Sequence, residues 1–378
     1  MKQKEKVIGI VAEYNPFHRG HEYLISEAKR LTGAEVCVSV MSGNFVQRGE
    51  PAVFNKWTRA ENAVRNGVDL VVELPVVYAV SGAEYFARGA ISVLEGLGGV
   101  THLAFGSESG DAEALERCSQ LLRNRDEEIS QLIKENTKRG MSYPAAREKA
   151  VLEIAPDTDS GILSEPNNIL ALEYMSKVNS MIPFTVKREG VGYHESASQI
   201  RKEMLQESEA FRKELEKSGE VFFDLLRVKI LSESPKELEK TASAGEGLGN
   251  RMKKLVRMCE SVDDFCRQMK TKRYTMTRIR RLMLQTVLDI TREDIEDAVP
   301  YIRVLAFNQN GGEFLKRAKK QELISIPVVD NINRDTEGKH TLGKTVEKDI
   351  LAGDIYNLIT GKDLYSNSDY VKKPVFVK

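Results

Sequence analysis

Two histidines with a glycine between them are the residues in this sequence best suited to chemistry. His18 and His21 stand three positions apart, Gly20 lies between them, and they are two of only five histidines in the chain. A β-branched apolar run at residues 6–12 precedes them and a helical pattern follows, so both rings are expected on the first turn of a helix. A lone histidine is more often a hydrogen-bonded core residue. A pair beside unpaired helix N–H groups instead predicts a phosphate site.

The surrounding elements alternate between strands and helices. Helical spacing at residues 21–31 and 58–65 separates short apolar runs, which indicates parallel βαβ units with an open sheet and ligands at the carboxyl ends of its strands. The predicted strands are residues 6–12, 36–41, 70–74, 100–105 and 183–188. Long amphipathic helices dominate after about residue 205. We therefore expect an α/β domain over residues 1–205 and a mostly α-helical domain over residues 206–378.

Composition argues against a disordered, fibrous or membrane-spanning protein. The 378 residues are 41% hydrophobic and 30% charged, which suits a globular chain with a sizeable core. No apolar run is long enough for a membrane span and no signal peptide is recognised, so a cytoplasmic location is expected. Four scattered cysteines are interpreted as small core residues, and no metal site is predicted.

The histidine segment resembles the H-x-G-H signature of the nucleotidylyltransferase superfamily, whose Rossmann-like fold is shared with class I aminoacyl-tRNA synthetases. Residues 196–201 (SASQIR) are similar to the second superfamily motif, with Ser198 and Arg201 at its phosphate-contacting positions. The resemblance implies that the histidines stabilise charge on the β and γ phosphates while an acceptor attacks the α phosphate. An ordinary serine N-cap with a solvated arginine is the alternative for the second motif.

Six longer strings resemble the bacterial tRNA(Met) cytidine acetate ligase family. They occur in order over most of the chain, at residues 9–21, 40–57, 67–75, 105–108, 165–174 and 272–281. The resemblance implies an ATP-dependent ligase that activates acetate as acetyl adenylate and acetylates N4 of the wobble cytidine of elongator tRNA(Met). Residues 1–205 would then be the ATP-binding catalytic domain and residues 206–378 the tRNA-binding domain. Mg²⁺ is expected with the polyphosphate, without identified protein ligands, and the oligomeric state stays open.

By the same resemblance, His18 and His21 are the catalytic residues and a continuous segment with several later positions binds ATP. The implied ATP-binding residues are Ile8, Gly9, Ile10, Val11, Ala12, Glu13, Tyr14, Asn15, Pro16, Phe17, His18, Arg19, Gly20, His21, Gly106, Asn167, Arg188, Ser198 and Arg201.

The net charge of zero conceals a basic segment. Residues 251–281 hold eleven basic and three acidic side chains, a surface that would attract an RNA backbone. Tyr274 is expected to stack on an unpaired base, with Arg278 and Arg281 on the outer side of an amphipathic helix. The predicted tRNA-binding residues are Lys270, Lys272, Arg273, Tyr274, Arg278 and Arg281. A solvated charged face is the alternative for this segment.

Two other functions remain open at this point. A nucleotidylyltransferase acting on a small phosphate-bearing acceptor would use the histidines but leave the basic segment unexplained. A non-catalytic RNA-binding protein would use the basic segment alone.

Overall fold

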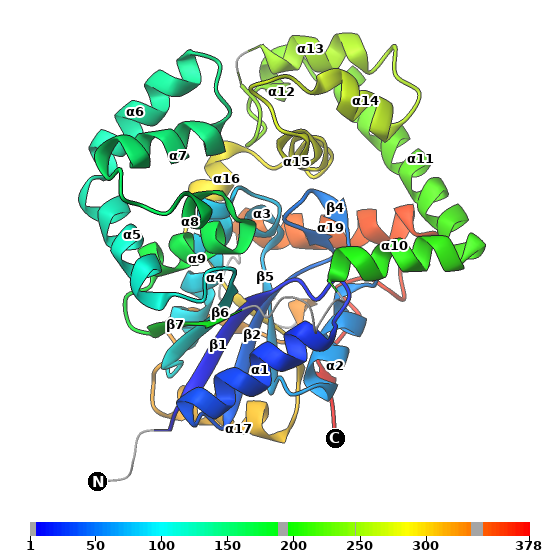
Figure 1. Cartoon of the computed structure of the whole chain (residues 1–378). Helices are drawn as coiled ribbons and strands as arrows, with labels where there is room; N and C mark the ends of the chain where they lie inside the picture. Colours follow the sequence, from blue (N-terminus) through cyan, green and yellow to red (C-terminus); the bar gives the residue numbers. More distant parts are fainter. Residues whose placement is uncertain (1–4, 188–195, 246, 334–342) are drawn as a thin grey trace.

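The computed structural model, which describes residues 5–187, 196–245, 247–333 and 343–378, has a largely parallel β-sheet at its centre (Figure 1). Its strands follow the order β10-β8-β5-β2-β1-β6-β7, and β9 pairs with β8. The strands are β1 Val7–Ala12, β2 Val36–Ser42, β5 Leu70–Leu74, β6 His102–Ser107, β7 Ile182–Lys187, β8 Ile302–Phe307, β9 Val328–Val329 and β10 Val375–Phe376. The five predicted strands are confirmed to within two residues at each end.

Helices cover both faces of this sheet because its strands are apolar on both sides. On one face, α1 (Arg19–Thr32) and α2 (Lys56–Arg65) pack against a core that includes Ile8 and Ile10. On the other face, α4 (Ala83–Leu97) and α9 (Pro166–Lys177) pack against a larger core that includes Val7. The predicted Rossmann-like class is therefore confirmed.

The sheet has its topological switch point beside β1. From β1 the chain passes through α1 to β2 on one side, and β6 pairs in parallel with β1 on the other side. A crevice forms outside the carboxyl ends of two such strands because their connections leave in opposite directions. The segment after Ala12 and the segment after Ser107 both enter this region, so the histidine motif lies where this fold binds ligands.

The chain after residue 205 differs from the prediction of a separate, mostly helical domain. Strand β8 pairs antiparallel with β5 inside the main sheet, and both β9 and β10 pair with β8. Residues on both sides of the predicted boundary at 205 thus share one sheet. The sequence pattern of these three strands was weak. Strands β9 and β10 have only two residues each, and β8 contains the charged Arg303 within its apolar run.

A helical unit does exist, but it ends before β8. Its core contains Phe223 from α11, Phe265 from α14 and Met283 from α15. The unit comprises α11 Glu209–Ser232, α12 Pro235–Leu238, α13 Leu248–Leu255, α14 Val262–Met269 and α15 Met276–Val287, and it stands above the carboxyl edge of the sheet (Figure 1). Residues 206–378 therefore divide into this helical unit and a return to the sheet.

The remaining helices complete the two layers and the edges of the sheet. They are α3 Val76–Ala79, α5 Ala112–Asn124, α6 Asp126–Lys138, α7 Tyr143–Ile154, α8 Ser160–Ser164, α10 Ala197–Glu207, α16 Arg292–Glu296, α17 Gln309–Lys320 and α19 Gly343–Ile359. None of the helices in the described ranges combines the length and apolar character needed to cross a membrane.

A buried network of charges joins the C-terminal segment to the sheet. Lys56 Nζ lies 2.8 Å from both Glu73 Oε1 and Asp369 Oδ1, and Arg303 lies 3.2 Å from Asp369 Oδ1. All four side chains are at least 96% buried. Nearby, Asp349 accepts from the Val76 N–H at 2.6 Å and from the Tyr301 hydroxyl. Three carboxylates therefore share two cations inside the protein.

Because the buried carboxylates outnumber the cations, the stability of the protein should depend on pH through Asp349. Burial and the Glu73 charge raise the pKa of Asp349 to about 7. The unfolded chain releases this proton near pH 4, so the free energy of unfolding should fall between pH 4 and pH 7, by up to roughly 1.4 kcal/mol per pH unit. Asp349→Asn should flatten this slope in urea titrations at pH 5, 6 and 7. An unchanged slope would show that Asp349 is ionised in the folded protein.

Candidate active site

The two histidines cap the first helix after β1 and stack against each other. His18 is the N-cap residue, and its Nδ1 accepts from the Gly20 N–H at 3.0 Å. His21 Nδ1 accepts from the His18 N–H at 3.2 Å, which completes a reciprocal capping box. The ring centroids are 3.8 Å apart. Because each Nδ1 is an acceptor here, the proton of each neutral ring belongs on Nε2.

Gly20 is required by this arrangement. A Cβ at position 20 would lie 2.9 Å from His18 Cε1, inside normal contact distance. Tyr14 and Phe17 pack against the His21 ring with centroids 4.9 and 5.4 Å away, which fixes its orientation. The short loop therefore presents two oriented imidazoles and the helix N-terminus to the same region.

Arg201 reaches this loop from the second predicted motif. Its Nη1 donates to the Asn15 carbonyl at 2.6 Å and its Nη2 donates to Ser198 Oγ at 3.2 Å. Ser196 caps helix α10 by accepting from the Gln199 N–H at 3.1 Å, so the N-cap interpretation holds for that serine. The alternative of a solvated arginine does not hold, because Arg201 is held between α10 and the histidine loop. Arg188, also predicted to bind ATP, lies outside the described residues.

Gly106 and Asn167 lie on neighbouring segments that Glu108 connects. Glu108 accepts from the Asn167 side-chain amide and from the Asn168 N–H, the latter at 3.0 Å, at the start of α9. In return the Glu108 N–H donates to Asn168 Oδ1 at 3.1 Å. Glu108 therefore fixes the turn after β6, with Gly106, against the start of α9. The sequence strings contained Glu108 and Asn168, but no role had been predicted for either residue.

Arg59 is a buried positioning residue that the sequence reading missed. Its guanidinium donates to the carbonyls of Phe54 at 2.9 Å and Ser42 at 3.1 Å, and also to those of Glu13 and Gly43. It thus ties the loop after β1 to the loop after β2. Burial lowers the pKa of Arg59 to about 10. The sequence places it in a helical pattern that also suits a solvated arginine, so only the fold reveals its role.

The Glu13 side chain also links the histidine loop to the segment that follows β2. Glu13 Oε1 accepts from the Gln47 N–H at 2.8 Å. Burial raises the pKa of Glu13, while Gln47 and the nearby Arg59, Arg48 and Arg201 favour its charged form. The carboxylate thus sits among three arginines at the carboxyl end of β1.

Several residues of the predicted tRNA surface lie differently from expectation. Tyr274 is only 7% exposed in the core of the helical unit, and the Arg278 guanidinium covers its ring at 4.8 Å. Arg281 points toward the loop after β2, where it donates to the Gln47 carbonyl at 3.3 Å. The expectations of an open tyrosine and of an outward Arg281 are therefore wrong. Lys270 and Lys272 are exposed, as predicted, and Arg273 is half-buried.

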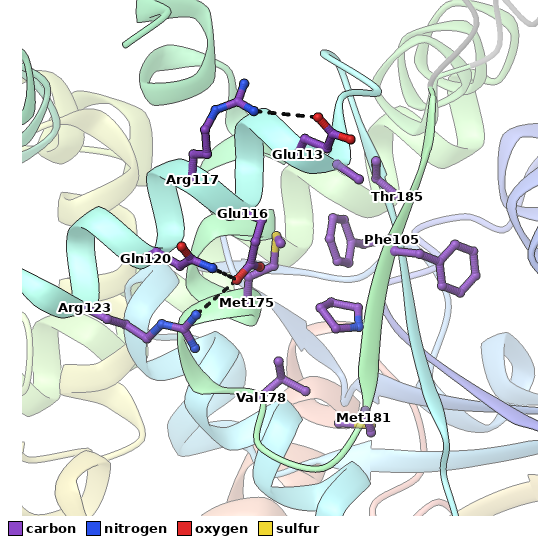
Figure 2. Close-up of a pocket in the computed structure, with 13 residues that line it drawn as sticks. Phe105, Glu113, Glu116, Arg117, Gln120, Arg123, Met175, Val178, Met181 and Thr185 are labelled. Carbon is purple, nitrogen blue, oxygen red and sulfur yellow. Dashed lines mark hydrogen bonds and ion pairs between the residues drawn. The ribbon is translucent and has the colours of Figure 1, made fainter. Parts of the chain in front are cut away.

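The chain also has a cavity of about 670 Å³ beside α5 and α9, on the face of the sheet that α9 covers (Figure 2). Phe105, Met175 and Thr185 line it, and the ion pair of Arg123 with Glu116 lies at its side. None of the predicted ATP-binding residues lines this cavity. The histidine site and the cavity are therefore separate features.

The four cysteines are buried, as predicted, and none of them forms a disulfide in the structure. Burial raises the pKa of each thiol, which makes these cysteines poor nucleophiles. In the described part of the chain, no three His, Cys, Asp or Glu side chains gather in a way that could hold a metal ion.

Comparison with known proteins identifies the family of this chain. Residues 5–370 match the HIGH Nucleotidyl Transferase family. The tRNA(Met) cytidine acetate ligase of Alkaliphilus metalliredigens is 34% identical, with 99% of each chain covered, and that of Clostridium perfringens is 35% identical, with 98% of this chain and 100% of the relative covered. The crystal structure of Thermotoga maritima TmcAL bound with alpha-thio ATP has a TM-score of 0.87 and 32% identity, over 98% of this chain and 99% of that one. The chain belongs to the tRNA(Met) cytidine acetate ligase family.

Proposed function

We propose that this protein uses ATP to activate acetate and then acetylates N4 of the wobble cytidine of elongator tRNA(Met). The observation that carries the proposal is the oriented pair His18 and His21 at the end of β1. The names of the relatives and the ATP analogue in the solved relative support the same reaction. The substrates are those of the cytoplasm, where we place the reaction.

In the proposed first step, an acetate oxygen attacks the α phosphorus of ATP. The bond between this phosphorus and the bridging oxygen of pyrophosphate breaks, giving acetyl adenylate and pyrophosphate. The Nε2–H groups of His18 and His21 donate to the β and γ phosphates and stabilise the charge that develops on the leaving group. Acetate is already an anion, so the attack needs no protein base.

In the second step, the cytidine N4 attacks the acetyl carbonyl, and the carbonyl carbon loses AMP. The nitrogen gives up one proton to the phosphate of the departing AMP, which leaves as an anion. The proposed role of the protein is to align the amine with the carbonyl and to exclude water.

Mg²⁺ commonly accompanies ATP, but the described residues provide no carboxylate cluster to hold it. The side chains proposed to meet the phosphates are donors: the two imidazoles and Arg201. They suit phosphate oxygens and do not suit a cation. Any metal would therefore be held by the phosphates and water, and we assign it no step.

The test is incubation of the purified protein with ATP, labelled acetate and elongator tRNA(Met), followed by mass spectrometry of the nucleosides. We expect label in N4-acetylcytidine at the wobble position, and AMP release that depends on acetate. Transfer of a nucleotide to a phosphate-bearing acceptor would support the nucleotidylyltransferase alternative instead. Binding of tRNA without any turnover would support the non-catalytic alternative.

The exposed lysines of the basic segment are proposed to contact the tRNA backbone. Replacing both Lys270 and Lys272 with alanine should weaken tRNA binding and reduce the salt slope of log affinity by about 2. Acetate-dependent pyrophosphate release without tRNA should stay unchanged. The matched control is the double alanine variant of Lys319 and Lys320, which are also exposed but lie on α17 at the opposite edge of the sheet (Figure 1). Equal effects of the two double variants would contradict this surface.

A further inference from the structure

A β-hairpin after β2 lies between the histidine loop and the basic helix α15. Its strands are β3 (Phe45–Val46) and β4 (Glu50–Pro51), and Figure 1 shows β4 beneath α15. The base is anchored, because Phe45 and Val46 are buried and the Asn44 side chain accepts from the Lys56 N–H at 2.8 Å. The hairpin is thus a fixed element with its three-residue tip directed toward the helical unit.

Glycine at the tip lets the helix approach the hairpin closely. Gly49 has φ of +78°, the left-handed conformation that three-residue hairpin loops favour at this position. A Cβ there would lie 2.4 Å from the backbone nitrogen of Arg281. The ion pair between Glu50 and Arg280 reinforces the same contact. Helix α15 and the hairpin therefore form one surface.

A single residue of the tip joins the two predicted binding regions. The Gln47 N–H donates to Glu13 of the histidine loop at 2.8 Å, and the Gln47 carbonyl accepts from Arg281 of α15 at 3.3 Å. The residue that follows, Arg48, is exposed. The two hydrogen bonds of Gln47 fix the position of the Arg48 backbone. The Arg48 side chain faces solvent, between the site proposed for ATP and the helix proposed for tRNA.

The surroundings of Arg48 are rich in positive charge. Arg48 lies close enough to Arg201 and Arg280 to lower the pKa of both, in addition to the effect of burial. Beside it, Arg281 has a buried Nε for which the described structure gives no hydrogen-bond partner. Glu13, Glu50 and Asp263 are the acidic groups that face this cluster in the described residues. Four arginines around three carboxylates leave a net positive surface that suits a phosphate.

We propose that Arg48 is a positioning residue that binds a backbone phosphate of the tRNA anticodon loop and holds the target cytidine beside the acetyl adenylate. The inference rests on the proposed function, because the cytidine must approach the nucleotide for the second step. His18, His21 and Arg201 already supply donors on the ATP side. Arg48 instead lies on the side of the site that is next to helix α15.

The test compares Arg48→Ala, Arg48→Lys and the wild type in two assays. Acetylation of elongator tRNA(Met) gives kcat/KM for tRNA as a function of salt, and acetate-dependent pyrophosphate release without tRNA reports the first step. We expect Arg48→Ala to lower kcat/KM for tRNA about tenfold or more, to reduce its salt slope by about 1, and to alter pyrophosphate release less than twofold. Arg48→Lys should recover most of the loss, because it restores the charge.

Arg30→Ala is the matched control, since Arg30 is an exposed arginine in the last turn of α1, at the end away from His18. It should resemble the wild type in both assays. Equal losses of both activities in Arg48→Ala would assign Arg48 to ATP and overturn the inference, as would an unchanged kcat/KM for tRNA. A wild-type protein that fails to acetylate tRNA would instead overturn the proposed function.

Discussion

His21→Ala should lower the rate of acetate-dependent pyrophosphate release by about 10²- to 10³-fold while leaving tRNA affinity within about twofold. The Nε2–H of His21 is proposed to donate to charge that grows on the leaving pyrophosphate, so its loss affects the transition state more than the bound ATP. Rates of pyrophosphate release at saturating ATP and acetate measure the first effect. Fluorescence anisotropy with labelled tRNA measures the second.

His21→Gln separates catalysis from helix capping. His21 Nδ1 accepts from the His18 N–H, and a glutamine at this capping-box position can accept the same bond. If the loss of activity came from the cap, His21→Gln would restore it. We expect the glutamine variant to recover stability but to remain at least about tenfold slower than the wild type. Activity of His21→Ala within tenfold of the wild type would contradict the proposed role.

The histidine motif could be predicted from the sequence because its geometry is local. Four consecutive residues determine the cap, the stacking of the rings and the need for Gly20. The alternation of strands and helices then placed this turn at the switch point of the sheet. Arg201 also came from a local motif, but its bond to the Asn15 carbonyl joins residues 186 positions apart and required the structure.

The missed residues share a different property, because their roles depend on backbone groups that sequence patterns do not encode. Arg59 binds four carbonyls from three separate segments, and Gln47 connects Glu13 to Arg281 through its own peptide groups. A hydrophobic pattern reports which side chains are buried. It does not report which carbonyl needs a donor.

Charge counting located the basic segment but could not tell exposed from enclosed side chains. Lys270 and Lys272 are exposed, whereas Arg281 lies against the hairpin and Tyr274 is in the core. The β8 strand escaped detection for a related reason. Arg303 interrupts its apolar run, yet Arg303 is 98% buried because Asp369 and Glu73 neutralise it. Buried ion pairs thus make strand residues look like surface residues.

Lys56→Met should lower the free energy of unfolding by about 3–5 kcal/mol. Methionine fills a similar volume, but Glu73 and Asp369 would keep only Arg303 as a cationic partner at their buried position. Trp57, the only tryptophan, has Lys56 Nζ 5.6 Å and the Arg303 guanidinium 5.3 Å from its ring, so its fluorescence in urea reports unfolding at this network. Burial of an uncompensated carboxylate raises its pKa in the folded state. The loss should therefore shrink as pH falls from 8 to 5.

Lys213→Met is the control, because it removes the same group from an exposed ion pair. Lys213 lies 2.8 Å from Glu209, and both side chains are 72% exposed. Solvent screens such a pair, so the variant should change the free energy of unfolding by no more than about 0.5 kcal/mol at any of these pH values. If Lys56→Met cost no more than Lys213→Met, the network would not stabilise the junction between the C-terminal segment and the sheet. A loss in Lys56→Met that did not shrink toward pH 5 would indicate a packing defect in place of buried, unpaired carboxylates.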